Sequence, residues 1–477
     1  MHRPKLLILG IDGFCREVYD YARQRIDIPT ITRLMEDGLS APLRSTLLPT
    51  SGTAWTSLCT GVNPGRHGIT GFTRWERQGK AHTGVALFNS HDLPVEYFWE
   101  TIARSAGLRS LVIRVPCTYP ARPFAGAMVV EQDFSIATAW PPELQPLLDA
   151  PENKVKEHWL GEGWENHAGD VIRKTGRMTR ALYAETRPDI CFVVFYVLDF
   201  VHHRIGYQTP LFLDMVKTLD ETLSTLLTMD EFTDLAVVSD HGMRSYGQQF
   251  LLDAWLRRKG YLAWPAATNY LDGDATRVYC TPSDIPGNYG KLFLNRSLVP
   301  AFAMGQLLDE VEAALRAETL DGIPLITDIW RRDQVYAGPH QDRMPDLVFR
   351  TTPSVRVASL WEPRAVLREE LVTDEALLLA NCHSRHGIFA WHNSEIPACA
   401  LDAPLDITDV PAWVLSRYGV PLPDNLESRP PEATLGLSAL FPRLPVQPAV
   451  YPQLAAVDSS LEHQAQTIES LRSLGYM

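Results

Sequence analysis

Short runs of consecutive apolar residues, each ending abruptly in polar ones, recur along the chain. Runs of about five to nine such residues, rich in branched side chains, are typical of strands buried on both faces of a sheet. The pattern predicts strands at Leu6–Gly10, Leu111–Val115, Met128–Val130, Ile190–Leu198, Leu235–Val238 and Ile388–Trp391.

Helical patterns lie between these runs. Apolar residues recur there at the three- and four-residue spacing of amphipathic helices. The spacing and the flanking residues predict helices over Tyr97–Ala106, Val171–Thr186, Pro210–Leu227 and Ala301–Ala317. Alternating strands and helices are typical of an α/β fold, in which helices cover both faces of a mostly parallel sheet. We therefore expect ligands to bind beyond the carboxyl ends of the strands.

Some segments do not follow this alternation. They are rich in tryptophan, proline, glycine, tyrosine and asparagine, and we interpret them as insertions that form a cap over the strand ends. They are Thr73–Leu93, Ala137–Glu165 and Trp264–Pro300.

The organisation predicted from these patterns is one catalytic domain over residues 1–395, followed by an extension over residues 396–477 that belongs to the same unit. The extension contains a proline-rich stretch, Pro421–Gln453, which we expect to wrap around the surface. A charged amphipathic helix is predicted at its end, over Ser459–Leu474. This helix is a candidate contact for a homodimer.

Composition narrows the class of protein. The formal net charge of -13 disfavours binding to nucleic-acid polymers or anionic lipids, so an anionic substrate needs local positive charge such as bound metal. The longest apolar run, Ile190–Leu198, is about half the length of a membrane span. Seven dispersed cysteines indicate reduced thiols rather than a disulfide framework. The apolar run near the start is too short for a signal peptide. We expect a cytoplasmic enzyme.

Three aspartates follow predicted strands. Asp12, Asp199 and Asp240 each come where an apolar run gives way to polar residues. A single aspartate at such a place is often only a helix cap or a turn residue. Three of them at the carboxyl ends of strands in one parallel sheet are expected to meet at one edge. The sequence therefore points to a polar site at that edge.

Histidines accompany the aspartates. His203 lies four residues after Asp199, His241 follows Asp240 directly, and His383 precedes a predicted strand. His202 competes with the first of these histidines, and His386 with the last. Oxygen and nitrogen donors in this mixture suit zinc or manganese, and three donors for each of two ions leave the open positions that catalytic sites need.

A candidate nucleophile lies in the segment Pro49–Trp55. Ser51 precedes a short predicted helix, Thr53–Cys59, whose first amide groups would face an anion. A serine hydroxyl is a poor nucleophile at its own pKa, but coordination to a metal activates it. Thr50 is the rival hydroxyl.

The order and spacing of these residues resemble the alkaline phosphatase superfamily, specifically its type I phosphodiesterase/nucleotide pyrophosphatase branch. The similarity runs from residue 5 to residue 395 and favours Ser51, His203 and His383 over their rivals. It also includes Thr60-Gly61, His67-Gly68, Trp330–Tyr336, Pro345–Phe349 and Leu471–Tyr476.

The resemblance implies two divalent ions, zinc with manganese as the alternative, and a small phosphate ester as substrate. One ion would be held by Asp12, Asp240, His241 and the Ser51 oxygen, the other by Asp199, His203 and His383. Ser51 would attack phosphorus in line, and water would hydrolyse the resulting phosphoserine. Phosphodiester cleavage is favoured. The alternatives are a phosphomonoesterase, a phosphotransferase or mutase, a phosphonate hydrolase and, remotely, a non-catalytic binding protein.

The sequence departs from the family in two places. Nucleotide-cleaving members usually have threonine at the position of Ser51, and asparagine at that of Phe72. Phe72 cannot donate the side-chain hydrogen bond that the asparagine gives to the phosphoryl group, which argues against a nucleotide substrate. The sulfatase motif is absent, because no proline or arginine follows Ser51 at the required spacing.

Overall fold

The protein is described by a computed structural model. It covers residues 4–78, 81–131, 137–153, 161–265, 271–281, 287–359, 366–373, 381–428, 437 and 439–452.

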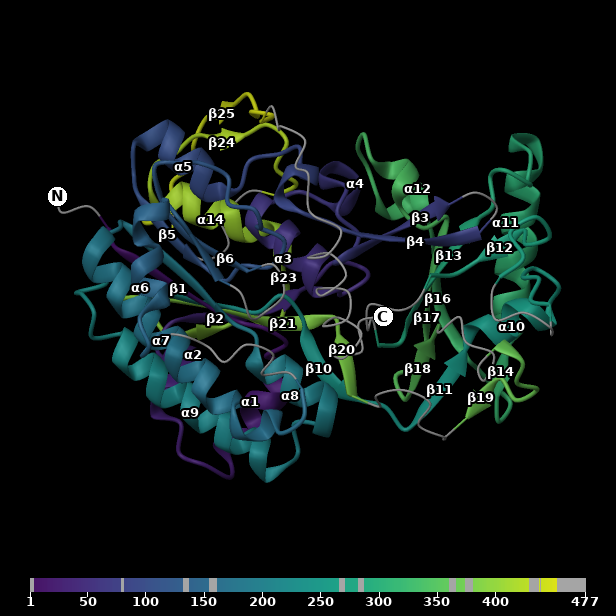
Figure 1. The fold of residues 1–477 in the computed structure, drawn as a ribbon, viewed down its shortest axis with the longest axis horizontal. Coiled ribbons are helices and arrows are strands. Elements are labelled where there is room, and N and C mark those ends of the chain that lie inside the picture. Colours follow the sequence, from purple (N-terminus) through teal and green to yellow (C-terminus); the bar gives the residue numbers. More distant parts are fainter. Residues whose placement is uncertain are drawn as a thin grey trace.

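A large mixed sheet forms the centre of the fold (Figure 1). Strands β9, β1, β8, β5 and β6 are parallel, whereas β21 and β7 run antiparallel to their neighbours. The mostly parallel sheet predicted from the apolar runs is thus confirmed. Its order is β22 (Cys399–Ala400), β2 (Leu39–Arg44), β21 (His386–Asn393), β9 (Asp234–Val238), β1 (Leu6–Ile11), β8 (Ile190–Phe195), β5 (Ser110–Ile113), β6 (Gly126–Glu131) and β7 (Ala137–Trp140), with β23 (Leu405–Asp406) beside β2.

Helices cover both faces of this sheet, as the α/β prediction requires (Figure 1). Alternate residues of β1 face the two layers: Leu7 and Leu9 pack into one core, Leu6 and Ile8 into the other. One layer contains α1 (Arg16–Arg23), α2 (Pro29–Glu36), α7 (Ala168–Thr186), α8 (Val197–Ile205) and α9 (Pro210–Leu226), and the other α3 (Ser51–Thr60), α5 (Phe98–Ala106) and α14 (Val410–Arg417).

A second lobe with its own apolar core lies beside the central sheet, on the right in Figure 1. The predicted insertion Trp264–Pro300 falls within it. Its strands are β11 (Gln248–Leu251), β12 (Val278–Tyr279), β13 (Tyr289–Leu294), β14 (Thr319–Leu320), β15 (Ile323–Pro324), β16 (Ile326–Arg331), β17 (Leu347–Thr351), β18 (Val355–Ala358) and β19 (Val372–Thr373), and its helices α10 (Leu252–Arg258), α11 (Ala301–Arg316) and α12 (Arg332–Val335).

Two features join the lobe to the catalytic face. The ribbon of β10 (Gly242–Ser245) and β20 (Asn381–Ser384) carries His383 from the lobe back to the sheet. Leu47 and Leu48, just before Ser51, pack against Tyr289, Tyr336 and Met344 of the lobe. The remaining elements of the catalytic part are α4 (Pro64–His67), the hairpin β3 (Thr73–Gln78) and β4 (Ala81–Leu87), and α6 (Gln145–Asp149).

The apolar run Ile190–Leu198 differs from the prediction. The strand ends at Phe195, and α8 begins at Val197, so Asp199 and His203 lie in one helix. A continuous apolar run gives no periodicity from which the change could have been read. The result is an i, i+4 pair on one helix face.

The C-terminal segment packs on the catalytic part. Phe441 contacts Trp391 of the central sheet and Trp413 of α14, and β24 (Leu422–Pro423) pairs with β25 (Val446–Gln447). The predicted helix Ser459–Leu474 lies outside the described residues. Among the residues that are described, no helix is long and apolar enough to cross a membrane.

Candidate metal centre and nucleophile

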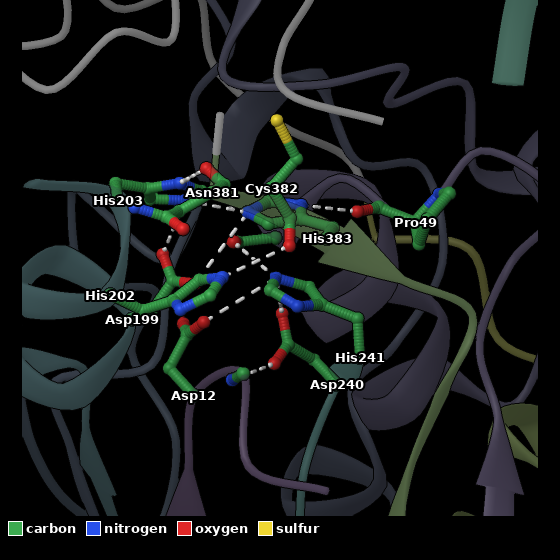
Figure 2. Close-up of polar contacts among 12 residues, drawn as sticks. Asp12, Pro49, Asp199, His202, His203, Asp240, His241, Asn381, Cys382 and His383 are labelled. Carbon is green, nitrogen blue, oxygen red and sulfur yellow. Dashed lines mark hydrogen bonds and ion pairs between the residues drawn. The ribbon is translucent and has the colours of Figure 1, made fainter. Parts of the chain in front are cut away.

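Three buried aspartates meet at the carboxyl end of the central sheet (Figure 2). Asp12 follows β1, Asp240 follows β9, and Asp199 lies in the first turn of α8, directly after β8. Because β9, β1 and β8 are adjacent in the sheet, the topology alone brings the three carboxylates together.

Three histidines are anchored in the same way around these carboxylates. The Nδ1 atom of His203 lies 2.8 Å from the carbonyl oxygen of Asn381, that of His383 2.6 Å from Pro49, and that of His241 3.1 Å from Gly242. A carbonyl oxygen only accepts, so each Nδ1 carries the proton. Each Nε2 is left with a lone pair, the form in which histidine binds a metal.

One cluster consists of Asp199, His203 and His383, whose donor atoms lie within 4.8 Å of one another. The Nε2 atoms of His203 and His383 are 2.9 Å apart. The Nε2 of His203 lies 3.1 Å from one oxygen of Asp199, and that of His383 lies 3.6 Å from the other. Two lone pairs that face each other at this distance repel unless a cation lies nearby. The donor set could therefore hold a metal ion.

A second cluster surrounds His241. Its Nε2 lies 3.5 Å from Asp12 Oδ1 and 3.2 Å from Asp240 Oδ2. These two carboxylate oxygens are buried and accept no hydrogen bond from the part of the chain that is described. Their partner oxygens are occupied, since Trp55 Nε1 donates to Asp12 at 2.8 Å and the Gly13 amide to Asp240 at 3.2 Å. Buried acceptors without donors fit a metal ion. An oxygen of Asp199 also lies within 4.8 Å of the donors of Asp12 and His241.

The electrostatics support the same reading. Burial, followed by repulsion from the neighbouring carboxylates, raises the pKa of Asp12 and Asp240. Burial also raises the pKa of Asp199, but the imidazoles of His203 and His383 outweigh it and hold this pKa well below its ordinary value. Three buried carboxylates this close together repel one another, so ionising all of them costs free energy unless positive charge lies nearby. Bound cations would supply that charge.

Ser51 is the first residue of α3, and its Oγ lies 3.0 Å from His241 Nε2. Thr50 precedes the helix and donates its hydroxyl to Thr53 instead, at 2.9 Å. Gly52 is packed so closely that an added Cβ would lie 2.7 Å from the Gly71 carbonyl. The main chain before Phe72 therefore lies against the start of α3, next to Ser51.

The rival histidines lie elsewhere. His202 is buried, with its Nε2 3.3 Å from each of two carbonyl oxygens, those of Arg244 and Cys382. His386 is exposed on β21. His67 is the buried last residue of α4; its Nε2 lies 2.9 Å from Ser57 Oγ, and its Nδ1 accepts the Ile69 amide at 3.0 Å. The structure thus brings together all seven residues predicted from the sequence: Asp12, Ser51, Asp199, His203, Asp240, His241 and His383.

Sequence reasoning missed the groups that orient these side chains. Trp55 carried a signal, since it lies one helical turn after Ser51 and therefore on the same face of α3. It is fully buried and holds Asp12. The carbonyls of Pro49 and Asn381 carried no signal, because any residue supplies a carbonyl.

The family model described as type I phosphodiesterase/nucleotide pyrophosphatase matches residues 6–389. No curated protein sequence matches the chain.

Solved structures share the fold. Phosphonoacetate hydrolase from Sinorhizobium meliloti 1021, in complex with phosphonoformate, is 18% identical with a TM-score of 0.60, over 86% of this chain and 94% of that chain. Murine ectonucleotide pyrophosphatase/phosphodiesterase 5, an inactive form in complex with AMP, is 15% identical with a TM-score of 0.54. The match covers 87% of this chain and 95% of the murine chain. The human protein of that name is 14% identical with a TM-score of 0.54, and the match covers 92% of this chain and 100% of the human chain. At these identities the likeness shows the fold alone.

Proposed function

Since the chain belongs to the type I phosphodiesterase/nucleotide pyrophosphatase family, a family of hydrolases, we propose that it cleaves phosphate esters through Ser51, with diesters favoured. The observation that carries this proposal is the placement of Ser51 Oγ 3.0 Å from His241 Nε2, at the edge of a cluster of buried carboxylates and anchored imidazoles.

We propose that this cluster holds two divalent ions. Asp12, Asp240, His241 and the Ser51 oxygen would hold one, and Asp199, His203 and His383 the other. Zinc suits this mixture of oxygen and nitrogen donors, and manganese is the alternative. When bound, the ions supply Lewis acidity and neutralise charge that develops on the phosphoryl group.

The chain's own groups do the rest. The amides of the first turn of α3 would face the substrate anion and favour its binding beside the nucleophile. The Ser51 hydroxyl gives up its proton, its Oγ forms a bond to phosphorus, and the ester oxygen leaves as the alcohol. Water then cleaves the phosphoserine and regenerates Ser51.

The buried setting also supports this chemistry. Asp12, Asp199 and Asp240 are almost fully buried, so the electrostatic interactions of the site act in a medium of low polarity. Each anchored imidazole is restrained by a hydrogen bond to the main chain, so its Nε2 needs no reorganisation to act as a ligand.

The test compares bis-p-nitrophenyl phosphate with p-nitrophenyl phosphate. Metal-reconstituted wild type, Ser51→Ala and the matched neighbour Thr50→Val are assayed with and without chelator. Diester turnover lost in Ser51→Ala and in chelator, but kept in Thr50→Val, would support the proposal. Preference for the monoester would favour a phosphatase or phosphotransferase. Inactivity on both esters with two ions bound would favour a phosphonate substrate, and failure to bind metal would overturn the proposal.

We also propose a reducing, cytoplasmic location. All seven cysteines are free thiols, and five of them are buried. Burial raises the pKa of Cys59 and Cys191, so these thiols are poorly reactive. Ratiometric thiol labelling of the protein purified under anaerobic conditions would test this location, since secreted chains oxidise their exposed thiols.

A further inference from the structure

A cavity of about 530 Å³ opens beside the nucleophile helix. Its wall on the catalytic side includes Thr53, two residues after Ser51, and Leu48 from the loop before it. The opposite wall belongs to the second lobe and includes Tyr279 and Phe293. Cavities of this size are typical of sites for small organic ligands. Its position indicates that it receives the organic part of the substrate.

The wall formed by the second lobe is flat and aromatic. The rings of Tyr279 and Phe293 are stacked, with centroids 5.5 Å apart and planes inclined by 20°. Phe88, which is nearly buried, lines the cavity as well. Aromatic rings in such an arrangement offer an apolar surface on which a planar group can lie.

The cavity is also rich in positive charge, in contrast to the chain as a whole, whose net charge is -13. Basic side chains come from the hairpin β3–β4, from β13 and the residues after it, and from the segment before β17. The lining includes the bases Arg74, Lys291, Arg296 and Arg343 and the acids Asp92 and Asp342.

Local pairing removes only part of this charge. Arg74 lies 2.6 Å from Asp92, which neutralises that pair. Arg296 lies 2.6 Å from Asp346, but Arg332 contacts the same carboxylate, so one negative charge is shared by two guanidinium groups. Asp342 adds a further negative charge to the lining. The four lining bases together with Arg332 still outnumber Asp92, Asp342 and Asp346 by two, so a surplus of positive charge remains.

Arg343 brings this charge close to the nucleophile helix. Gly68, at φ +79°, lies in the turn that ends α4, and a Cβ added there would be 3.2 Å from Arg343 Nη1. The segment around Arg343 is docked on this turn, since the His340 amide donates to the Gly65 carbonyl at 2.8 Å. The guanidinium is thus held at the wall of the cavity beside the end of α4.

We propose that the natural substrate carries a second anionic group on its organic part, which Lys291 and Arg343 bind while the flat portion lies against Tyr279 and Phe293. This inference rests on the proposed function, because it assigns the substrate class of that same site. Guanidinium and ammonium groups recognise a carboxylate or phosphate through charge-assisted hydrogen bonds.

The test uses two diesters that differ only in one charge, methyl 3-carboxyphenyl phosphate and methyl 3-carbamoylphenyl phosphate. Release of each phenol by the metal-reconstituted enzyme gives the ratio of the two kcat/KM values. We expect a ratio of about 10 or more in the wild type, falling towards 1 in Lys291→Met and in Arg343→Gln. Arg173→Gln, a surface change on α7, is the matched control and should keep the wild-type ratio. Because the ratio is internal, a partly unfolded preparation does not alter it.

Binding of the products 3-hydroxybenzoate and 3-hydroxybenzamide, measured by titration calorimetry, separates the two proposals. Charge-selective binding without turnover of either diester would support the cavity assignment and overturn the hydrolase. Turnover of both diesters with a ratio near 1 would overturn the cavity assignment alone. A wild-type preference that survives in both variants would overturn the roles of Lys291 and Arg343.

Discussion

Trp55 Nε1 donates a hydrogen bond of 2.8 Å to Asp12 Oδ2, so the helix that begins with Ser51 also holds a carboxylate of the proposed metal centre. Trp55 follows Ser51 by four residues and is fully buried. The bond occupies one carboxylate oxygen and leaves Oδ1 directed at His241. A single helix therefore couples the position of the proposed nucleophile to the orientation of a proposed metal ligand.

We expect Trp55→Phe to lower metal affinity by about 10- to 100-fold, because partners that orient a ligand contribute about that much. Trp413→Phe is the matched control, since its indole lies in the same core and its Nε1 has no hydrogen-bond partner in the described structure. Metal titration and kcat/KM would be measured for both. Equal losses in the two variants would show that packing, rather than the bond to Asp12, matters.

The adjacent histidines of α8 provide a second comparison. We expect His203→Asn to lose one ion and to reduce kcat/KM by about a hundredfold or more, because its Nε2 faces Asp199 and His383. His202→Asn should keep both ions and instead lose about 1 to 3 kcal/mol of unfolding free energy, since it leaves buried carbonyls without a donor. Metal content by mass spectrometry and denaturant titration distinguish them. Loss of an ion in His202→Asn alone would reverse the assignment.

Asp240→Asn should stabilise the metal-free protein while it abolishes activity. Burial, and then repulsion from Asp199, raises the pKa of Asp240, so ionising it costs free energy in the folded state. The unfolded carboxyl titrates near 3.8, and the folded one higher, so the stability of metal-free wild type falls as pH rises through this window. The amide removes this dependence and still accepts the Gly13 hydrogen bond through its oxygen.

Thermal melts of both proteins in chelator at pH 5 and pH 8 check this expectation. The stability gain from Asp240→Asn should be larger at pH 8. With saturating zinc the order should reverse, because ligand binding stabilises only the protein that retains its site. A variant that is less stable than wild type in chelator at both pH values would contradict the proposed repulsion.

Much of the fold could be predicted from local pattern. The strand at Leu6–Ile11 and the helix at Pro210–Leu226 were recognisable because an apolar run or a helical periodicity continues over their whole length. The boundary between β8 and α8 could not be recognised, because apolar residues continue from Ile190 to Leu198 across the change from strand to helix. The extent of the second lobe was also hidden, since its sheets pair segments far apart in the chain, such as Gln248 with Val355.

The candidate site was also predictable only in part. Asp12 and Ser51 could be found because their chemistry is carried by the side chain itself and because the order of the motifs restricts the choice. The hydrogen bond between His383 and the carbonyl of Pro49 could not be predicted, because the two residues are distant in the chain and every residue has a main-chain carbonyl. The charged cavity was missed for a similar reason: Arg74, Lys291 and Arg343 come from three separate segments.

His67, which lies outside the proposed metal centre, leads to a prediction about how the free energy of unfolding depends on pH. Burial lowers its pKa to about 3, whereas the unfolded imidazole titrates near 6.5. Its contribution to stability is thus fully present above pH 6.5 and is lost as pH falls towards 3, because only the unfolded state gains the proton in that window. The loss should reach about 2 kcal/mol at pH 5. His67→Gln cannot titrate, yet it offers an acceptor for the Ile69 amide and a donor for Ser57.

Urea denaturation of the wild type and of His67→Gln in chelator, at pH 7.5 and pH 5, checks this prediction. The wild type should lose more stability than the variant, by about 2 kcal/mol. His202, whose pKa burial also lowers to about 3, is present in both proteins and cancels from the difference. Equal losses would mean that the His67 imidazole is protonated in the folded protein, and its nitrogen could then not accept the Ile69 amide.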